Sequence, residues 1–275
     1  MNLRKLFLLP LVVFIAACQQ PLTQSEEMTK VSGTGFDADA PTVLITGSNR
    51  GIGLALTKYY SSEGWNIIAT ARNPDKASDL QGLAAANPQI TIEQLDVTDL
   101  DRIAYLGEAY ADVPVDVLIN NAAMLGDLEK QSFGSYDKEL FDQVMAVNVF
   151  GPMKMIEAFL PSVLLSEQKK IVTMSSGLGS LTLMGGMKPM AYYRISKAGM
   201  NMSMRGIRAE LKPQGVTVAL LAPGMVGTQL LADSGYDGPS LTPEESAAAV
   251  AKNIASLTTK DRGKPINFNG KNIPW

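Results

Sequence analysis

From residue 41 to residue 275, short apolar runs rich in β-branched residues alternate with longer stretches of helical periodicity. A strand that is apolar on both faces must be covered on both, and helices that connect successive parallel strands provide that cover. The alternation therefore predicts one α/β domain, a doubly wound parallel sheet of seven strands, over residues 41–275. The predicted strands are residues 42–46, 65–71, 90–95, 115–119, 170–174, 216–221 and 265–268, and the predicted helices are residues 51–63, 74–86, 99–111, 136–165, 192–211 and 243–256.

The residue types that the chain lacks narrow its chemistry. Histidine is absent from all 275 residues, which excludes Ser-His-Asp and Cys-His mechanisms and any histidine-ligated metal. The single cysteine, Cys18, excludes a disulfide framework and a zinc knuckle. A balance of 24 Lys and Arg against 27 Asp and Glu provides no basic field for nucleic acid. Catalysis must therefore use Tyr, Lys, Ser, Asn, carboxylates or a cofactor.

The N-terminus has the order of a targeting segment. Arg4 and Lys5 precede an apolar run at residues 6–17, which is too short to span a bilayer as a helix. The run ends in Ile-Ala-Ala before Cys18, which resembles the lipobox of bacterial lipoproteins, where the cysteine receives lipid. We therefore expect a signal peptide over residues 1–18 with lipidation at Cys18. An apolar leader with an incidental cysteine is the alternative.

A glycine-rich turn lies where the first predicted strand becomes the first predicted helix. Its glycines have the spacing G-x-x-x-G-x-G. Such a turn needs glycine for a tight reversal, for close approach of a pyrophosphate and for packing of the helix on the strand, while free helix N–H groups face the phosphates. The turn predicts a dinucleotide site of the Rossmann fold, and an ordinary tight turn is the alternative. Its residues are Gly47, Ser48, Asn49, Arg50, Gly51, Ile52 and Gly53.

Tyr193 and Lys197 lie four residues apart on a predicted helix, so they share one face. A phenol with its ordinary pKa of about 10 is a poor proton shuttle at neutral pH. An ammonium beside it stabilises the phenolate and lowers that pKa, which makes the pair a candidate acid–base catalyst. A solvated helix face is the alternative.

In this order and at these intervals, the glycine turn and the Tyr-x-x-x-Lys pair resemble the short-chain dehydrogenase/reductase (SDR) family, in particular its single-domain members. The resemblance extends from Thr42 to Trp275. A subgroup that includes C-factor and the sniffer-type carbonyl reductases shares the run Tyr-Arg-x-Ser-Lys, a longer loop before it and a C-terminus similar to residues 268–275.

The resemblance implies a catalytic tetrad of Asn148, Ser176, Tyr193 and Lys197. In such a tetrad Tyr193 exchanges a proton with the substrate oxygen, and the serine hydrogen-bonds that oxygen. Lys197 also holds the nicotinamide ribose, and Asn148 links Lys197 to water. The interval to the tyrosine that is usual in the family would select Ser180. Because Ser176 directly follows a predicted strand, we expect Ser176, with Ser180 as the alternative.

Three further motifs of the family mark the rest of a cofactor site. Its adenine-contacting pair matches Asp96-Val97. Its N-N-A-G strand end matches residues 120–123, with alanine in place of the usual glycine, which adds one methyl group near the ribose. Its P-G-x-V-x-T segment beside the nicotinamide matches residues 223–228. The resemblance thus implies cofactor contacts at Asp96, Val97, Asn120, Ala122, Tyr193, Lys197, Pro223, Gly224, Val226 and Thr228.

The end of the second predicted strand indicates which nicotinamide binds. A carboxylate there would accept the 2′-hydroxyl of NAD and repel a 2′-phosphate. The strand instead runs into Arg72, with no acid before Asp75, and Arg50 lies in the glycine turn. Both arginines can donate charge-assisted hydrogen bonds to a 2′-phosphate. We therefore expect NADP as the cofactor; two arginines in solvated loops are the alternative.

The expected function is NADP-dependent reduction of an aldehyde or ketone to an alcohol, or the reverse oxidation. The alternative is a non-catalytic dinucleotide-binding protein for signalling or redox sensing, as the resemblance to C-factor implies. Methionines in residues 181–190 and Met225 suit an apolar carbonyl compound, or equally packing or an oligomer surface. The short segment between Thr228 and the helix beginning at Pro243 predicts an open pocket.

The leader and the domain favour different compartments. A lipid on Cys18, with residues 19–40 as a disordered tether, would hold the domain on the periplasmic side of a membrane. NADP is a cytoplasmic metabolite, and translation from Met28 would instead yield a cytoplasmic enzyme. We expect the lipid-anchored form. The other expected partners are a small carbonyl or alcohol substrate and further copies of the chain, in a homodimer or homotetramer.

Overall fold

The computed structural model of the chain describes residues 35–185, 190–261 and 263–275. Its strands are β1 (Thr42–Ile45), β2 (Asn66–Ala71), β3 (Ile90–Gln94), β4 (Val117–Asn120), β5 (Lys170–Met174), β6 (Thr217–Ala222) and β7 (Ile266–Asn267). They form one parallel sheet in the order β3-β2-β1-β4-β5-β6-β7. The predicted seven-stranded, doubly wound sheet is confirmed. Strands β2 and β3 are added on one side of β1 and strands β4 to β7 on the other, so the order reverses between β1 and β4. Sheets of this kind bind ligands at that point.

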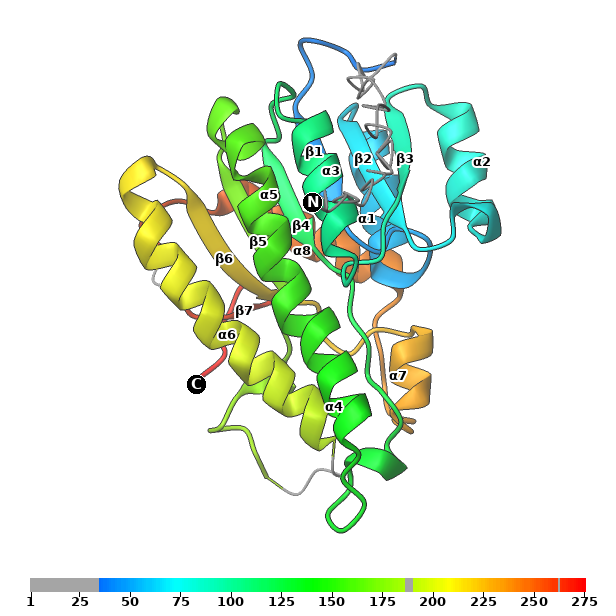
Figure 1. Cartoon of the computed structure of the whole chain (residues 1–275), viewed down its shortest axis with the longest axis vertical. Helices are drawn as coiled ribbons and strands as arrows, with labels where there is room; N and C mark the ends of the chain where they lie inside the picture. The colour runs from blue at the N-terminus through cyan, green and yellow to red at the C-terminus, as the bar shows by residue number, and fades with distance from the viewer. Residues whose placement is uncertain (1–34, 186–189, 262) are drawn as a thin grey trace, which may run out of the picture.

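Helices cover both faces of the sheet (Figure 1). Those on one face are α1, α2 and α8, and those on the other are α3, α5 and α6. The helix bounds are α1 (Gly51–Ser62), α2 (Ser78–Ala86), α3 (Leu100–Ala109), α4 (Lys138–Met145), α5 (Gly151–Leu165), α6 (Ala191–Leu211), α7 (Gln229–Asp233) and α8 (Pro243–Ser256).

The central strands are buried on both faces. Successive residues of a strand point to opposite sides of a sheet. In β1, Val43 and Ile45 belong to the core with α1 and α8, while Leu44 belongs to the core with α3, α5 and α6. Every residue of β1, β2, β4, β5 and β6 is buried. Side chains that meet a ligand must therefore lie at or beyond the strand ends.

The helix predicted over residues 136–165 is interrupted. A π turn (Ala146–Phe150) separates α4 from α5. Pro152 lies four residues after Asn148 and has no N–H, so it cannot make the α-helical hydrogen bond to the Asn148 carbonyl. This missing hydrogen bond coincides with the break, which lies at a predicted catalytic residue. Single π turns inside helices are frequent at functional sites.

Two further differences from the predictions concern helices. Residues predicted as the start of a helix at Pro74 form a separate 3₁₀ turn, and α2 begins at Ser78. The segment between Thr228 and Pro243 contains α7, which the sequence analysis did not predict. Thr228 caps this short helix by accepting from the Leu231 N–H at 3.4 Å. The segment is therefore a folded element rather than a plain loop.

The predicted targeting features lie outside the described residues. These features are the signal peptide, the lipidation site Cys18, the alternative start Met28 and most of the tether, all within residues 1–34. The lipid anchor therefore stays a prediction. Within the ranges that the structure describes, no helix is both long enough and apolar enough to span a membrane.

Helices α3 and α5 touch through their backbones. A Cβ at Gly107 of α3 would be 2.7 Å from the Ala158 carbonyl oxygen of α5, closer than side chains approach backbone. Gly107 thus sets the distance between the two helices. Gly82 of α2 has nothing within 4 Å of the same position and offers a matched comparison.

Gly107→Ala should destabilise the protein by about 1–3 kcal/mol, because α3 and α5 must separate to admit the methyl group. Gly82→Ala should instead stabilise it by about 0.5–1 kcal/mol, since alanine loses less backbone entropy in a helix. Urea unfolding of both variants measures the two changes in free energy. Equal unfolding midpoints would contradict the close contact at Gly107.

Candidate active site

The turn between β1 and α1 requires glycine at three positions. Gly47 and Gly51 have φ angles of +71° and +56°, in the left-handed region that favours glycine. A Cβ at Gly53 would be 2.1 Å from the Gly47 carbonyl oxygen. Only glycine there lets α1 start against the turn. The spacing G-x-x-x-G-x-G therefore meets a steric requirement at each glycine.

The N-terminus of α1 suits an anionic ligand. Arg50 is the N-cap residue, in extended conformation, and its side chain does not cap the helix. The first N–H groups of such a helix attract phosphate. Asn49 and Arg50 are exposed beside them. A dinucleotide pyrophosphate therefore fits this turn, with the backbone as its main partner.

Ser48 and Ile52 maintain the turn. Ser48 is fully buried, and its hydroxyl donates to the Ile45 carbonyl at 2.9 Å. Its N–H donates to the Thr70 carbonyl at 2.8 Å. Ile52 is partly buried and packs against the core on the α1 face. Both hydrogen-bond donors of Ser48 are therefore used within the fold.

Asn121 fastens the turn to the end of β4, a role that the sequence analysis did not assign. Its Nδ2 donates to the carbonyls of Thr46 (2.9 Å) and Gly47 (3.2 Å). Its N–H donates to the Thr46 hydroxyl at 2.9 Å. The only sequence signal was its place in the Asn-Asn-Ala-Ala strand end. Asn121 therefore holds the glycine turn against the end of β4.

Asn120 and Ala122 lie at the same edge. Asn120 is 3% exposed, and its Nδ2 donates to the Thr173 hydroxyl at 3.4 Å. Its Oδ1 is buried and accepts no hydrogen bond from the described residues. A buried oxygen without a partner is unfavourable, which is a reason for a polar ligand here. The Ala122 methyl carbon lies 3.3 Å from the Cβ position of Gly47.

A cavity of about 510 Å³ lies at the carboxyl ends of β2 and β3. Its wall is polar and charged, so it suits a polar ligand. Arg72 and Asp96, both predicted cofactor residues, line it, while Arg50 does not. The lining residues are Arg72, Asn73, Gln94, Asp96, Asp99 and Arg102.

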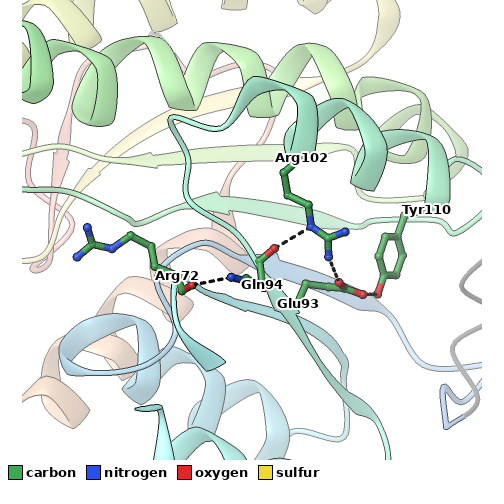
Figure 2. A network of polar contacts seen from close by, with 5 residues as sticks. All are labelled: Arg72, Glu93, Gln94, Arg102 and Tyr110. Carbon is green, nitrogen blue, oxygen red and sulfur yellow. Dashed lines mark hydrogen bonds and ion pairs between the residues drawn. The ribbon is translucent and has the colours of Figure 1, made fainter. Parts of the chain in front are cut away.

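The two arginines of this cavity have different surroundings. Arg102 donates to the Gln94 carbonyl and to Glu93, both at 2.9 Å, and Glu93 also accepts from the Tyr110 hydroxyl at 2.7 Å. Figure 2 shows Glu93 between Arg102 and Tyr110, with the guanidinium of Arg72 pointing away from them. Arg72 makes no ion pair within the described part of the chain. Its charge is therefore available to a ligand phosphate.

Asp96 and Val97 shape the turn after β3. The Asp96 carboxylate accepts from the N–H (2.9 Å) and the hydroxyl (2.7 Å) of Thr98. Val97 is 6% exposed, and its carbonyl oxygen would be 2.6 Å from a Cβ at Gly151. The pair thus lies between the cavity and the start of α5.

The segment 223–228, which follows β6, lies beside the glycine turn. Gly224 has a φ of +86°, and the Pro223 carbonyl accepts from the Ser246 hydroxyl at 2.8 Å. Val226 is buried. The Thr228 methyl group is 3.2 Å from the Cβ position of Gly51. The structure therefore brings the predicted pyrophosphate turn and the predicted nicotinamide segment into contact.

Asn148 lies buried in the π turn and connects two elements. Its Nδ2 donates to the Met124 carbonyl (2.8 Å) and the Ser196 hydroxyl (3.0 Å), and its Oδ1 accepts from the Met124 N–H (2.9 Å). Ser196 in turn donates to the Tyr193 carbonyl at 2.8 Å. Ser196 was part of the Tyr-Arg-x-Ser-Lys run but had no assigned role. It joins Asn148 to the helix that carries Tyr193.

Tyr193 and Lys197 share one face of α6, as predicted, and both are buried. The Lys197 ammonium is 5.5 Å from the Tyr193 ring centroid and donates to the Met174 carbonyl at 2.8 Å. Burial lowers the pKa of Lys197 to about 8 and raises the pKa of Tyr193 to about 12. The predicted lowering of the Tyr193 pKa also depends on a bound oxidised nicotinamide and stays a prediction, while burial by itself raises this pKa. Loss of water outweighs an ammonium that points to a carbonyl oxygen.

Three serines follow β5. Ser175 is buried and donates to Asn201 Oδ1 at 2.7 Å. Ser180 is also buried, and its hydroxyl accepts from the Leu183 N–H at 3.2 Å. Ser176 is half-buried, with its hydroxyl accepting from the Leu178 N–H at 3.1 Å. The greater accessibility of Ser176 at the strand end favours it over Ser180.

Comparison with known proteins agrees with this geometry. A family model described as short chain dehydrogenase matches residues 41–237. The chain is 34% identical over 239 residues to the 1-hydroxy-2-glutathionyl-2-methyl-3-butene dehydrogenase of Rhodococcus sp. (strain AD45), covering 85% of this chain and 99% of that protein.

Solved structures of carbonyl reductases have the same fold. The NADPH-bound carbonyl reductase from chicken fatty liver matches with a TM-score of 0.77 at 29% identity, covering 86% of this chain and 99% of that one. The carbonyl reductase Sniffer of D. melanogaster matches with a TM-score of 0.76 at 27% identity, covering 86% and 100%. The chain belongs to the short-chain dehydrogenase family and is an NAD(P)-dependent dehydrogenase or reductase.

Proposed function

We propose that the protein is an NADP-dependent carbonyl reductase that uses Tyr193 as its proton donor. The observation that carries the proposal is the burial of Tyr193 and Lys197 together on α6, with Lys197 bonded to the end of β5. The carboxyl end of β5 lies at the same edge of the parallel sheet as the glycine turn after β1. A proton donor and a dinucleotide turn at one edge suit hydride transfer to a carbonyl group.

The chain's own residues supply the proton and the positioning. When bound, a nicotinamide cofactor supplies the hydride. Tyr193, with its pKa raised to about 12, is protonated at neutral pH and donates to the carbonyl oxygen as that oxygen gains negative charge. Ser176 donates a hydrogen bond to the same oxygen. Lys197 holds its ammonium beside the phenol and stabilises the phenolate that proton transfer leaves.

Arg72 carries the preference for NADP in this proposal. Arg72 lines the cavity after β2 and has no acidic partner among the described residues. Arg50 is exposed at the start of α1 and adds a second cation. The chicken carbonyl reductase is NADPH-bound, and a carbonyl reductase from Pseudomonas aeruginosa PAO1 is in complex with NADP. These two structures support the same cofactor here.

An apolar carbonyl compound is the proposed substrate. Leu181 and Met184, in the segment between Ser176 and α6, and Met225 beside the nicotinamide segment expose apolar surface. A second cavity, of about 400 Å³, lies under α7. Thr228 is one of its lining residues, so this cavity adjoins the predicted nicotinamide segment. The reverse reaction, oxidation of the corresponding alcohol, uses the same groups.

Tyr193→Phe should lower turnover by about 100-fold or more, because it removes the proton donor and little volume. NADPH binding should change little, since the glycine turn and Asn121 are untouched. Turnover is measured by NADPH oxidation over a panel of aldehydes and ketones, and binding by titration of NADPH fluorescence. Full activity in this variant would remove Tyr193 as donor and favour a non-catalytic role for its hydroxyl.

Ser176→Ala should lower kcat/KM by about 100-fold, because it removes a hydrogen bond to the developing oxyanion. Ser180→Ala is the matched control, the same substitution in the same segment. It should change kcat/KM by less than about threefold, since Ser180 is buried whereas Ser176 is half-buried at the strand end. The opposite ranking would transfer the catalytic role to Ser180.

Arg72→Asp should weaken NADPH binding by about 10–100-fold, the worth of a hydrogen bond to a charged group, and should strengthen NADH binding. Lys76→Asp is the matched control: it makes the same change of charge at an exposed residue that does not line the cavity. It should have a much smaller effect on the ratio of the two dissociation constants. Equal binding of both cofactors by the unmodified protein would contradict the preference.

A further inference from the structure

Gln131 lies in the short 3₁₀ turn between β4 and α4, and its side chain is fully buried. Its Oε1 accepts from the backbone N–H groups of Tyr192 (3.2 Å) and Tyr193 (3.3 Å). Its Nε2 donates to the carbonyls of Leu125 and Asp127, both at 3.1 Å. The two N–H donors determine which end of the amide faces α6. One side chain thus makes four hydrogen bonds between two distant segments.

The contact matters because α6 has no capping side chain of its own. Its N-cap residue, Met190, makes no side-chain hydrogen bond to the helix. Helices α3, α4, α7 and α8 are instead capped by their own N-cap residues. Tyr192 and Tyr193 are the second and third residues of α6, whose N–H groups an N-cap satisfies. Gln131 supplies that cap from another part of the chain.

A second buried amide makes a parallel connection. Asn148 bonds to Met124, in the segment that holds Gln131, and to Ser196, one turn further along α6. A small apolar cluster of α4 and α6 side chains packs at the same corner. The segment 124–131, which continues from the cofactor-binding end of β4, is therefore attached to α6 at two places.

We propose that Gln131 is a positioning residue for Tyr193, holding the first turn of α6 at a fixed place relative to the cofactor-binding end of β4. The inference rests on the proposed function, in which Tyr193 gives a proton to the substrate. Gln131 is fully buried and acts through the backbone of α6. A reacting group displaced by about 1 Å can lose about 100-fold in rate, so such a tether bears directly on turnover.

Gln131→Met keeps the length of the side chain and removes all four hydrogen bonds. Ser132→Ala is the matched control, because Ser132 follows in the chain and donates to the Leu128 carbonyl at 2.9 Å within the same loop. Hydrogen exchange of the Tyr192 and Tyr193 amides should accelerate about tenfold in Gln131→Met and stay at the wild-type rate in Ser132→Ala. Unchanged exchange in Gln131→Met would show that the start of α6 does not depend on Gln131.

The kinetic readout separates positioning from folding. In Gln131→Met, kcat for NADPH-dependent reduction should fall about 10–100-fold, while the substrate KM and the NADPH Kd change by less than about threefold. The nucleotide site is held separately, by the glycine turn and Asn121. Wild-type kcat together with faster exchange would overturn the proposal. A wild-type protein without turnover would overturn the proposed function. In that case, hydrogen exchange at the Tyr192 and Tyr193 amides would still show whether Gln131 caps α6.

Gln131→Glu tests the tether if Gln131→Met does not fold. Its carboxylate still accepts from the Tyr192 and Tyr193 N–H groups, and even when protonated it donates to only one of the Leu125 and Asp127 carbonyls. Exchange at the two tyrosine amides should therefore stay slow, while kcat falls. Retention of kcat in this variant would show that capping of α6 alone is sufficient, and would overturn the positioning role.

Discussion

The central strands are buried on both faces, and this constraint determines where the protein can do chemistry. No polar group can project from the middle of such a sheet without losing its water. Because all the strands are parallel, their carboxyl ends share one edge, and the groups that follow them meet there. Gly47 after β1, Arg72 after β2, Asn120 at the end of β4 and Ser176 after β5 therefore lie along one edge of the sheet although most are far apart in sequence.

Buried amide side chains hold that edge together. An amide both donates and accepts, so one side chain can connect two backbone segments without placing a charge in the interior. Asn121 joins the glycine turn to β4, Asn148 joins the segment after β4 to α6, and Gln131 joins the same segment to the first turn of α6. The three residues lie between the parts of the site and hold them at a fixed spacing. The predicted tetrad alone does not account for this frame.

The fold was predictable because its signals are local. Apolar runs of strand length and glycines with a steric role can be recognised within a few residues, and the strand order confirms the prediction from them. Gln131 was not predicted, because its partners lie 61 and 62 residues away and no periodicity marks it. The π turn at Asn148 was also missed, although Pro152 offered a local reason for it. The pKa of Tyr193 could not be inferred from its spacing to Lys197, since it depends on burial.

The charge state of the pair follows from that burial. Removal from water raises the pKa of Tyr193 and lowers the pKa of Lys197, so each group is shifted toward its neutral form. The phenol is protonated throughout the neutral range, which is the form that reduction of a carbonyl needs. Oxidation of an alcohol needs the phenolate, and that form requires a positive charge close to the ring. Lys197 provides one at 5.5 Å only while it stays protonated, below a pKa of about 8. Without a cofactor, the chain's own groups therefore keep the phenol of Tyr193 protonated at neutral pH.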